Sequence, residues 1–269
     1  MSTTGNKDSR LAREAEFQDS RMKRALEGKG EVRDKFYFIN RRANDLYNRL
    51  HDGLTGKRVV VVGSSDCGVT PLARRGVYAE GIDISEVSIE KLNRSIDKEG
   101  LRDFASAVVM DAQDLTYEAE SIDTITCSGV LHHLDANSAL RSWSRCLRPD
   151  GAAILFEPLA FHPLAAIFRA LTPSMRTPDE HPLRGRDFEL MRKYFGSVER
   201  HNFGLTTPVL AAFTMIPILS GLSKRALPFF EQLDAVLLRA FPILGRFCWL
   251  TVVRLTNPRH PSRRAAESS

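Results

Sequence analysis

The chain has 269 residues, enough for one globular domain with a substantial core and some embellishment. Its formal net charge of +5 suits an anionic substrate, a membrane surface or nucleic acid, and selects none of them. The four cysteines, Cys67, Cys127, Cys146 and Cys248, have neither disulfide-type nor metal-type spacing, and we find no metal-ligand spacing elsewhere. The first residues are polar and unlike a signal peptide, so we expect a cytoplasmic protein with reduced thiols.

Two helices are expected before the first strand, over residues 10–27 and 32–52. In the second helix, apolar residues spaced by three and four positions share one face: Phe36, Ile39, Ala43, Leu46 and Leu50. Residues 1–56 would then form an N-terminal helical cap whose first nine residues are disordered.

A strand, a tight turn and a helix follow. The run from Val59 to Val62 is typical of a buried parallel strand over 58–62. The strand ends at Gly63, and Gly68 is placed to begin a helix, so the loop approaches the nucleotide pattern G-x-G-x-x-G. Asp83 lies 20 residues after Gly63, at the end of the next short strand, where doubly wound folds place a ribose-binding carboxylate.

Strands and helices then alternate, which predicts a parallel sheet. The expected strands are 58–62, 79–83, 106–110, 122–127 and 152–156, and the expected helices are 69–75, 86–98 and 136–147. The segment Arg148-Pro-Asp-Gly151 is expected to be a turn. Helices over 159–172 and 185–195 and strands over 197–204 and 247–255 complete the chain.

About forty mostly apolar residues, 206–246, separate the last two strands, which is too many for a hairpin turn. Residues 203–223 carry no charge, Pro208 and Pro217 interrupt them, and Lys224 and Arg225 follow. This pattern suits a lid over a lipophilic substrate or a surface that docks on a membrane interface. A helical pair packed on the sheet edge and a true membrane insertion also stay open.

The order of these segments resembles the class I S-adenosylmethionine-dependent methyltransferases, especially the type 11 small-molecule group. The resemblance covers roughly residues 57–160 and rests on the loop after Val62, on Asp83, and on the runs 108–115, 122–134 and 147–157. It implies an α/β fold with a Rossmann-like seven-stranded sheet and an antiparallel last strand. The methyltransferase domain would comprise 57–205 and 247–256, with 206–246 as an apolar helical insertion and 257–269 as a disordered tail.

The resemblance also implies where S-adenosylmethionine would bind. The loop would wrap the methionine portion of the cofactor through Gly63, Ser64, Ser65, Asp66 and Gly68. Asp83 would hold the ribose hydroxyls, with Ile84 packing on the adenine. The remaining contacts would come from Asp111 and Ala112 at the adenine amino group and from Cys127 and Ser128 on the methionine side.

The loop departs from the family pattern in one respect. Family members usually carry an acidic residue two positions before the first glycine, and this chain has Val61 there. We hypothesise that Asp66 supplies the missing negative charge.

Three residues are candidates for catalysis. His132 and His133 follow the fourth strand at the edge that faces the cofactor, and Glu157 lies at the carboxyl end of the fifth strand. Methyl transfer from a sulfonium requires no metal, and it needs a general base only where the acceptor must lose a proton.

We therefore expect methyl transfer from S-adenosylmethionine to a small lipophilic acceptor: a natural product, an isoprenoid or quinone, or a lipid-linked sugar. An NAD(P)-dependent oxidoreductase and a cofactor-binding enzyme of non-methylating chemistry are the alternatives. A nucleic-acid methyltransferase usually has Asn/Asp-Pro-Pro-aromatic where this chain has Ser128-Gly-Val-Leu131, so no nucleic-acid partner is expected. The acceptor, the oligomeric state and membrane association through 206–246 are left open.

Overall fold

A computed structural model describes residues 13, 15–16, 19–20, 37–63, 68–172, 180–213 and 217–260. Of the helix expected over 10–27, the five described residues are all helical, and the rest of that prediction lies outside the described residues. Also outside the described residues lie Ser64, Ser65 and Asp66 of the loop and residues 261–269 of the predicted tail.

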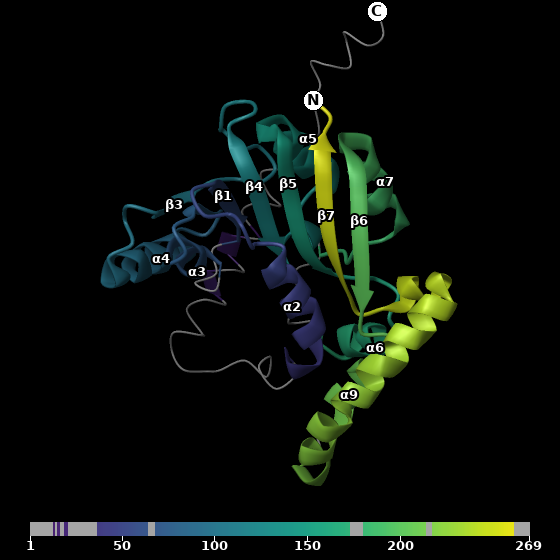
Figure 1. Cartoon of the computed structure of the whole chain (residues 1–269). Coiled ribbons are helices and arrows are strands. Elements are labelled where there is room, and N and C mark those ends of the chain that lie inside the picture. The colour runs from purple at the N-terminus through teal and green to yellow at the C-terminus, as the bar shows by residue number, and fades with distance from the viewer. Residues whose placement is uncertain are drawn as a thin grey trace, which may run out of the picture.

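Seven strands form a single sheet in the order β3-β2-β1-β4-β5-β7-β6 (Figure 1). The strands are β1 Arg58–Val62, β2 Tyr78–Asp83, β3 Ala105–Val109, β4 Ile122–Ser128, β5 Leu147–Pro158, β6 Phe195–Phe203 and β7 Leu250–Pro258. Strands β1 to β5 pair in parallel, whereas β7 is antiparallel to both β5 and β6. The predicted seven-stranded sheet with an antiparallel last strand is therefore confirmed.

Helices cover both faces of the sheet. On one face, α3 (Val69–Ala73) and α4 (Glu86–Glu99) pack on β1 to β3 around Val59 and Val61. On the other face, α5 (Ala136–Cys146) and α7 (Gly185–Tyr194) pack on alternate residues such as Val60 and Val62. Because β-strand side chains alternate between faces, four consecutive buried valines supply both cores.

The N-terminal cap region contains η2 (Tyr37–Asn40) and α2 (Arg41–Arg49). Of the helix expected over 32–52, residues 32–36 lie outside the described residues, and 50–52 form a turn after α2. Helix α2 lies in front of the sheet in Figure 1, and Tyr47 packs edge-on against Phe156 of β5 with ring centroids 5.7 Å apart. Helix α2 therefore lies on the same face of the sheet as α3 and α4 and covers β5, β7 and β6, the strands that those two helices leave uncovered there.

The turn expected over 148–151 is instead part of β5. Ile122 pairs with Leu147 but Thr124 pairs with Ala152, so residues 148–151 bulge out opposite Asp123. A Cβ on Gly151 would lie 3.0 Å from the carbonyl oxygens of Arg148 and Asp123, which explains the glycine at the end of the bulge.

Beyond the carboxyl ends of β5 and β6 lie α6 (Pro163–Leu171), α8 (Pro208–Phe213), α9 (Pro217–Ala240) and η5 (Pro242–Phe247) (Figure 1). The described residues of segment 206–246 are mostly helical. Pro208 and Pro217 begin helices instead of interrupting them, and Pro228 lies within α9. Within the described part of the chain, none of the helices combines the length and apolarity that a membrane span requires.

Strand β7 extends two residues past the domain boundary expected at 256. Pro258 pairs with Phe195, the Arg259 N–H donates to the Tyr194 carbonyl at 2.8 Å, and His260 is buried. Residues 257–260 thus belong to the folded domain.

Candidate functional site

The predicted site residues meet at one edge of the sheet. Because β1, β2, β3 and β4 run in parallel, their carboxyl ends bring Gly63, Asp83, Asp111 and Ser128 to the same side. Glu157 reaches that edge from β5.

Gly63 ends β1 in a backbone conformation that favours glycine, with φ of +83°. A Cβ at this position would lie 2.5 Å from the Cγ2 of Val130, which follows β4. The turn after β1 and the segment after β4 therefore lie so close together that only a glycine fits at position 63. Gly68, at the other end of the loop, is the residue from which α3 begins.

Asp83 ends β2 with its carboxylate held in a fixed orientation. The Asp83 Oδ1 accepts a hydrogen bond from the Ser85 N–H at 2.9 Å, and the Ser85 hydroxyl caps α4 by accepting from the Ser88 N–H. The same hydroxyl donates to Asp19, so the N-terminal helix reaches this edge. Ile84, between Asp83 and Ser85, is partly exposed.

Asp111 follows β3 in a similar turn. The Asp111 Oδ1 accepts from the Gln113 N–H at 2.8 Å and from the Gln113 side-chain amide at 3.0 Å. Gln113 in turn accepts from the Asp135 N–H at 2.8 Å, which ties the turn to the start of α5. Ala112 is buried, and its carbonyl accepts from the indole N–H of Trp143 at 2.8 Å.

The two residues expected on the methionine side of the cofactor point different ways. Ser128, the last residue of β4, is exposed. The Cys127 side chain is fully buried in the core beneath the edge, with its Sγ 3.4 Å from Glu157. Burial raises the pKa of the Cys127 thiol well above its usual value, so this sulfur is a neutral core group.

Glu157 and His132 form a buried pair, and backbone N–H groups hold the Glu157 carboxylate in place. Glu157 is fully buried, and its Oε1 accepts from the N–H groups of Val130 and Leu131 at 3.1 and 2.8 Å. Its Oε2 lies 2.7 Å from the Nδ1 of His132. With Nδ1 facing a carboxylate, the imidazole presents its Nε2 away from Glu157.

Glu180 joins this pair, and sequence reasoning missed it. The His132 Nε2 lies 4.0 Å from the Glu180 Oε1, and the His181 N–H donates to the His132 carbonyl at 2.9 Å. The His132 and His133 rings stack with centroids 4.1 Å apart. Glu180 lies 47 residues beyond His133 in an irregular segment, so no spacing in the sequence could have indicated this proximity.

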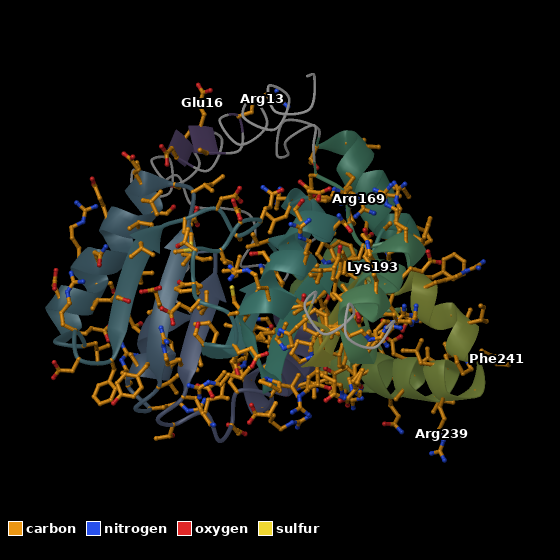
Figure 2. The ribbon with its side chains drawn as sticks, turned by 90° about the horizontal axis from the view of Figure 1, so that it is seen from above. Arg13, Glu16, Arg169, Lys193, Arg239 and Phe241 are labelled. Carbon is orange, nitrogen blue, oxygen red and sulfur yellow. The ribbon has the colours of Figure 1, made fainter. Side chains whose placement is uncertain are left out.

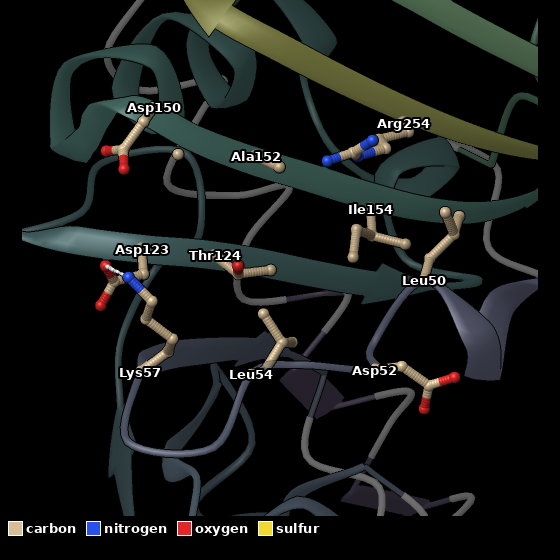
Figure 3. A pocket seen from close by; sticks show the side chains of 11 residues that line it. Leu50, Asp52, Leu54, Lys57, Asp123, Thr124, Asp150, Ala152, Ile154 and Arg254 are labelled. Carbon is tan, nitrogen blue, oxygen red and sulfur yellow. Dashed lines mark hydrogen bonds and ion pairs between the residues drawn. The ribbon is translucent and has the colours of Figure 1, made fainter.

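A separate cavity of about 160 Å³ lies toward the opposite edge of the sheet, between β4, β5 and the segment 50–57 that leads into β1 (Figure 3). Lys57 Nζ lies 3.4 Å from the Asp123 Oδ1 across this cavity, and Arg148 lies 2.9 Å from the same oxygen. Both cations, together with the Arg58 N–H, lower the pKa of Asp123 against the opposing effect of burial. We interpret this cavity as the surroundings of an ion-pair network that stabilises the ends of the strands.

Comparison with known proteins relates both the sequence and the fold of the chain to methyltransferases. Residues 61–155 match the family described as methyltransferase domain. A ubiquinone biosynthesis O-methyltransferase of Hahella chejuensis is 32% identical over 126 residues, 43% of this chain and 48% of that protein. The chain spans about half the length of the curated relatives it matches.

Solved structures share the fold. A geranyl diphosphate C-methyltransferase from Streptomyces coelicolor A3(2), crystallised with Mg²⁺, geranyl diphosphate and S-adenosyl-L-homocysteine, is 12% identical, with a TM-score of 0.56 over 81% of this chain and 79% of that one. The [4+2]-cyclase SpnF is 15% identical, with a TM-score of 0.53 over 81% of both chains. Residues 61–155 of the chain thus match a methyltransferase-domain family, and its seven-stranded sheet with an antiparallel last strand has the fold of the solved methyltransferases.

Proposed function

We propose that the protein transfers a methyl group from S-adenosylmethionine to a small lipophilic acceptor. The observation that carries the proposal is the convergence of Gly63, Asp83 and Asp111 with the buried His132–Glu157 pair at one sheet edge. The curated relatives named for ubiquinone biosynthesis and the structural relative that methylates geranyl diphosphate support an isoprenoid or quinone type of acceptor.

The residues at the edge fit the cofactor. Gly63 lets the turn after β1 lie directly against Val130, since any side chain there would meet that residue. The oriented carboxylates of Asp83 and Asp111 suit the ribose hydroxyls and the adenine amino group, and Ile84 would pack on the adenine. Ser64, Ser65, Asp66 and Gly68 would hold the methionine end. When bound, S-adenosylmethionine supplies an electrophilic methyl group on a sulfonium.

His132 is the residue that we propose as the general base. Glu157 is buried and already accepts from two backbone N–H groups and the imidazole, so it positions His132 instead of meeting the acceptor. An acceptor hydroxyl at the edge would donate its proton to the His132 Nε2 while its oxygen attacks the methyl carbon. His133, stacked on His132, would orient the acceptor.

The acceptor would be lipophilic because α6, which follows β5 at this edge, exposes apolar side chains. Ile167 and Leu171 are 56% and 76% exposed, and Phe161 precedes the helix at 52%. Apolar side chains beside a polar site favour a substrate with an apolar tail.

The SpnF similarity keeps a non-methylating reaction as the second candidate, because that cyclase has the same fold. Calorimetry with S-adenosylmethionine, S-adenosylhomocysteine and NAD tests the cofactor, and transfer of a labelled methyl group to a prenylated catechol tests the reaction. We expect micromolar binding of S-adenosylhomocysteine and a methylated product. Binding of NAD alone would establish the oxidoreductase alternative, and cofactor binding without methyl transfer to any prenylated phenol would favour the cyclase type.

We also propose that α9 docks on an anionic membrane surface. The face of α9 that packs on the protein holds apolar and acidic residues. Leu227 is buried in a cluster with Ile39 and Leu210. Glu231 and Asp234 are also buried, and Asp234 accepts from the N–H groups of Leu205 and Thr206 at 3.0 and 2.7 Å. The outward face carries Leu222, Phe229 and Val236, which are 61%, 67% and 56% exposed.

Charge on this surface is of one sign. Lys224, Arg225 and Arg239 are exposed, and the two acidic residues of segment 206–246 are the buried ones. Arg239 and Phe241 both point outward at the end of α9 in Figure 2. Exposed apolar residues with basic neighbours are the composition of an interfacial helix on anionic lipid.

Co-sedimentation with vesicles tests this docking. We expect binding to vesicles that contain anionic lipid, weakened by salt, and a loss of at least about tenfold in a Leu222→Gln, Phe229→Gln, Val236→Gln variant. The matched control is Tyr78→Gln with Phe104→Gln, two exposed aromatics on the far side of the sheet. Equal binding of the triple variant and the unaltered protein would refute docking through α9.

A further inference from the structure

We propose that His132, His133 and Glu180 bind a divalent transition-metal ion of the zinc class. Each residue offers one ligand atom, and the three atoms lie within 4.8 Å of one another. Two imidazole nitrogens and a carboxylate oxygen form a ligand set that Zn²⁺ favours over Mg²⁺ or Ca²⁺.

The strongest argument for a metal site is the carboxylate that faces the other ring nitrogen of His132. A metal-binding histidine typically donates its other ring N–H to a carboxylate, which fixes the ring and its tautomer. Glu157 occupies that position, at 2.7 Å from Nδ1, and is itself immobilised by the N–H groups of Val130 and Leu131. The His132 Nε2 is thereby left as the metal-facing atom.

The other two ligands are held beside that nitrogen by the backbone. His133 is the neighbouring residue in η3 (Leu131–His133), where the two rings stack at 4.1 Å. Glu180 is brought in by the hydrogen bond from the His181 N–H to the His132 carbonyl, which places its Oε1 4.0 Å from the His132 Nε2. Ligand atoms around Zn²⁺ lie about 3.3 Å apart, given bonds of about 2.0–2.1 Å, so small side-chain rotations would close the site.

Three protein ligands leave at least one coordination position open, which is the arrangement of catalytic zinc sites. If the protein is the methyltransferase proposed above, on which this step rests, the acceptor oxygen would bind the metal at the open position. With the metal bound, the His132 Nε2 would be a ligand and would no longer act as the general base. A metal-bound hydroxyl is a stronger acid, so it would release its proton to solvent before methyl transfer. The acceptors that this site favours are therefore phenols, catechols or enols.

The experiment is a titration of the full chain, without a histidine tag, with Co²⁺ as a spectroscopic probe and Zn²⁺ as competitor. We expect the protein to bind one equivalent of Co²⁺ and to show the visible d–d absorption bands typical of four- or five-coordinate Co²⁺. Zn²⁺ should displace the Co²⁺ and remove these bands. His133→Ala and Glu180→Gln should each weaken Co²⁺ binding by more than about tenfold. Glu157→Gln, which changes no proposed ligand but alters the support of His132, should weaken Co²⁺ binding by about 10–100-fold if the variant folds.

The matched control is His201→Ala, which removes a histidine that also pairs with a glutamate, at 2.9 Å from Glu199, on the exposed edge strand β6. This variant should bind Co²⁺ like the unaltered protein. Unchanged Co²⁺ affinity in His133→Ala and Glu180→Gln, or an equal loss in His201→Ala, would overturn the proposed site. Calorimetry of S-adenosylhomocysteine binding on the same preparations with EDTA separates the two proposals, since it tests the cofactor site without the metal.

Discussion

The Oε2 of Glu157 on β5 lies 2.7 Å from the Nδ1 of His132, and both side chains are buried at the carboxyl edge of the sheet. Glu157 also receives the N–H groups of Val130 and Leu131, the residues that lead from β4 into η3. One carboxylate therefore fixes both the turn after β4 and the imidazole that this turn presents.

Replacing Glu157 by Gln tests that relationship directly. We expect the His132 ring to change from a single Nδ1-protonated tautomer to a mixture, because the amide no longer provides an anion for Nδ1–H. The buried site should also lose about 1–3 kcal/mol of unfolding free energy. Nitrogen chemical shifts of the histidine rings report the tautomer, and denaturant unfolding reports the stability. A folded variant with an unchanged tautomer would show that Glu157 does not position His132.

Asp83→Asn should weaken S-adenosylhomocysteine binding by about 10–100-fold, the loss of one or two hydrogen bonds to a charged acceptor. The asparagine oxygen can still accept from the Ser85 N–H, so the turn after β2 should be kept. Calorimetry provides the measurement, with Asp150→Asn, an exposed residue at the opposite edge of the sheet, as the control. Equal affinities in the two variants would rule out a cofactor contact by Asp83.

Gly63→Ala should destabilise the fold by about 1–3 kcal/mol, from a positive φ and a close contact with Val130. Gly100→Ala is the matched control, because Gly100 has a similar φ of +66° and nothing within 4 Å of the added Cβ. The difference between the two variants in denaturant unfolding isolates the contact. Adding Val130→Ala should reduce the loss of stability caused by Gly63→Ala. If Val130→Ala does not reduce this loss, the contact with Val130 is not its cause.

Glu231→Gln should loosen the junction between α9 and the N-terminal region. Glu231 is buried, and Arg41 donates to its two carboxylate oxygens at 2.7 and 2.6 Å. This hydrogen bond raises the pKa of Arg41 above its usual value. Since Arg41 is half exposed, we expect a loss of only about 1–2 kcal/mol in unfolding free energy. Glu199→Gln, in an exposed pair with His201, should change stability by less than about 0.5 kcal/mol.

His51 should make stability fall as pH is lowered. Its Nδ1 lies 2.6 Å from the Tyr47 carbonyl and must donate, so its Nε2 accepts from the Thr126 hydroxyl at 2.8 Å, an arrangement that requires neutral imidazole. Burial lowers the pKa of His51, and burial likewise lowers the pKa of His162. The unfolded chain therefore binds more protons than the folded one below a pH of about 6.5.

Stability from these two histidines is full above that pH and declines as pH falls toward their lowered pKa values, by at most about 1.4 kcal/mol per pH unit for each. Urea unfolding at about pH 7.5 and pH 5.5 measures the decline. The His51→Gln variant should show a smaller decline, with the remaining part due to His162 and to carboxylates. An unchanged difference between the two pH values would show that His51 does not resist protonation.

Much of the fold was predictable because its signals are local. The β-branched run at Val59 to Val62 and the glycine that follows it define β1 and its turn from neighbouring residues alone. The Ser85 and Asp135 caps lie three residues before the N–H groups that they accept from. The bulge over 148–151 was predicted incorrectly, because Pro and Gly favour a turn whether or not the strand resumes its pairing afterwards.

The candidate site was predictable in its position and only partly in its roles. The resemblance to a known family indicated Gly63, Asp83 and Asp111, and a position after the fourth or fifth strand indicated His132, His133 and Glu157. The structure brings these residues to one edge because parallel strands share the direction of their carboxyl ends. Their side-chain directions were not predictable. Glu157 turns inward to His132, and Cys127 turns into the core, because each depends on which residues pack against β4 and β5. The roles of Ser64, Ser65 and Asp66 stay predictions.

The sequence by itself determined the alternation of strands and helices, and with it a parallel sheet, since these follow from the periodicity of apolar residues. The antiparallel last strand and the methyltransferase group were implied by the resemblance of its segment order to a known family. Only the tertiary structure decided that Glu180 lies beside His132, and that α9 buries Glu231 and Asp234 while it exposes Phe229. Those arrangements join residues as far apart as Arg41 and Glu231, 190 positions along the chain. No local pattern encodes such a contact, because its energy depends on a partner that arrives only when the chain has folded.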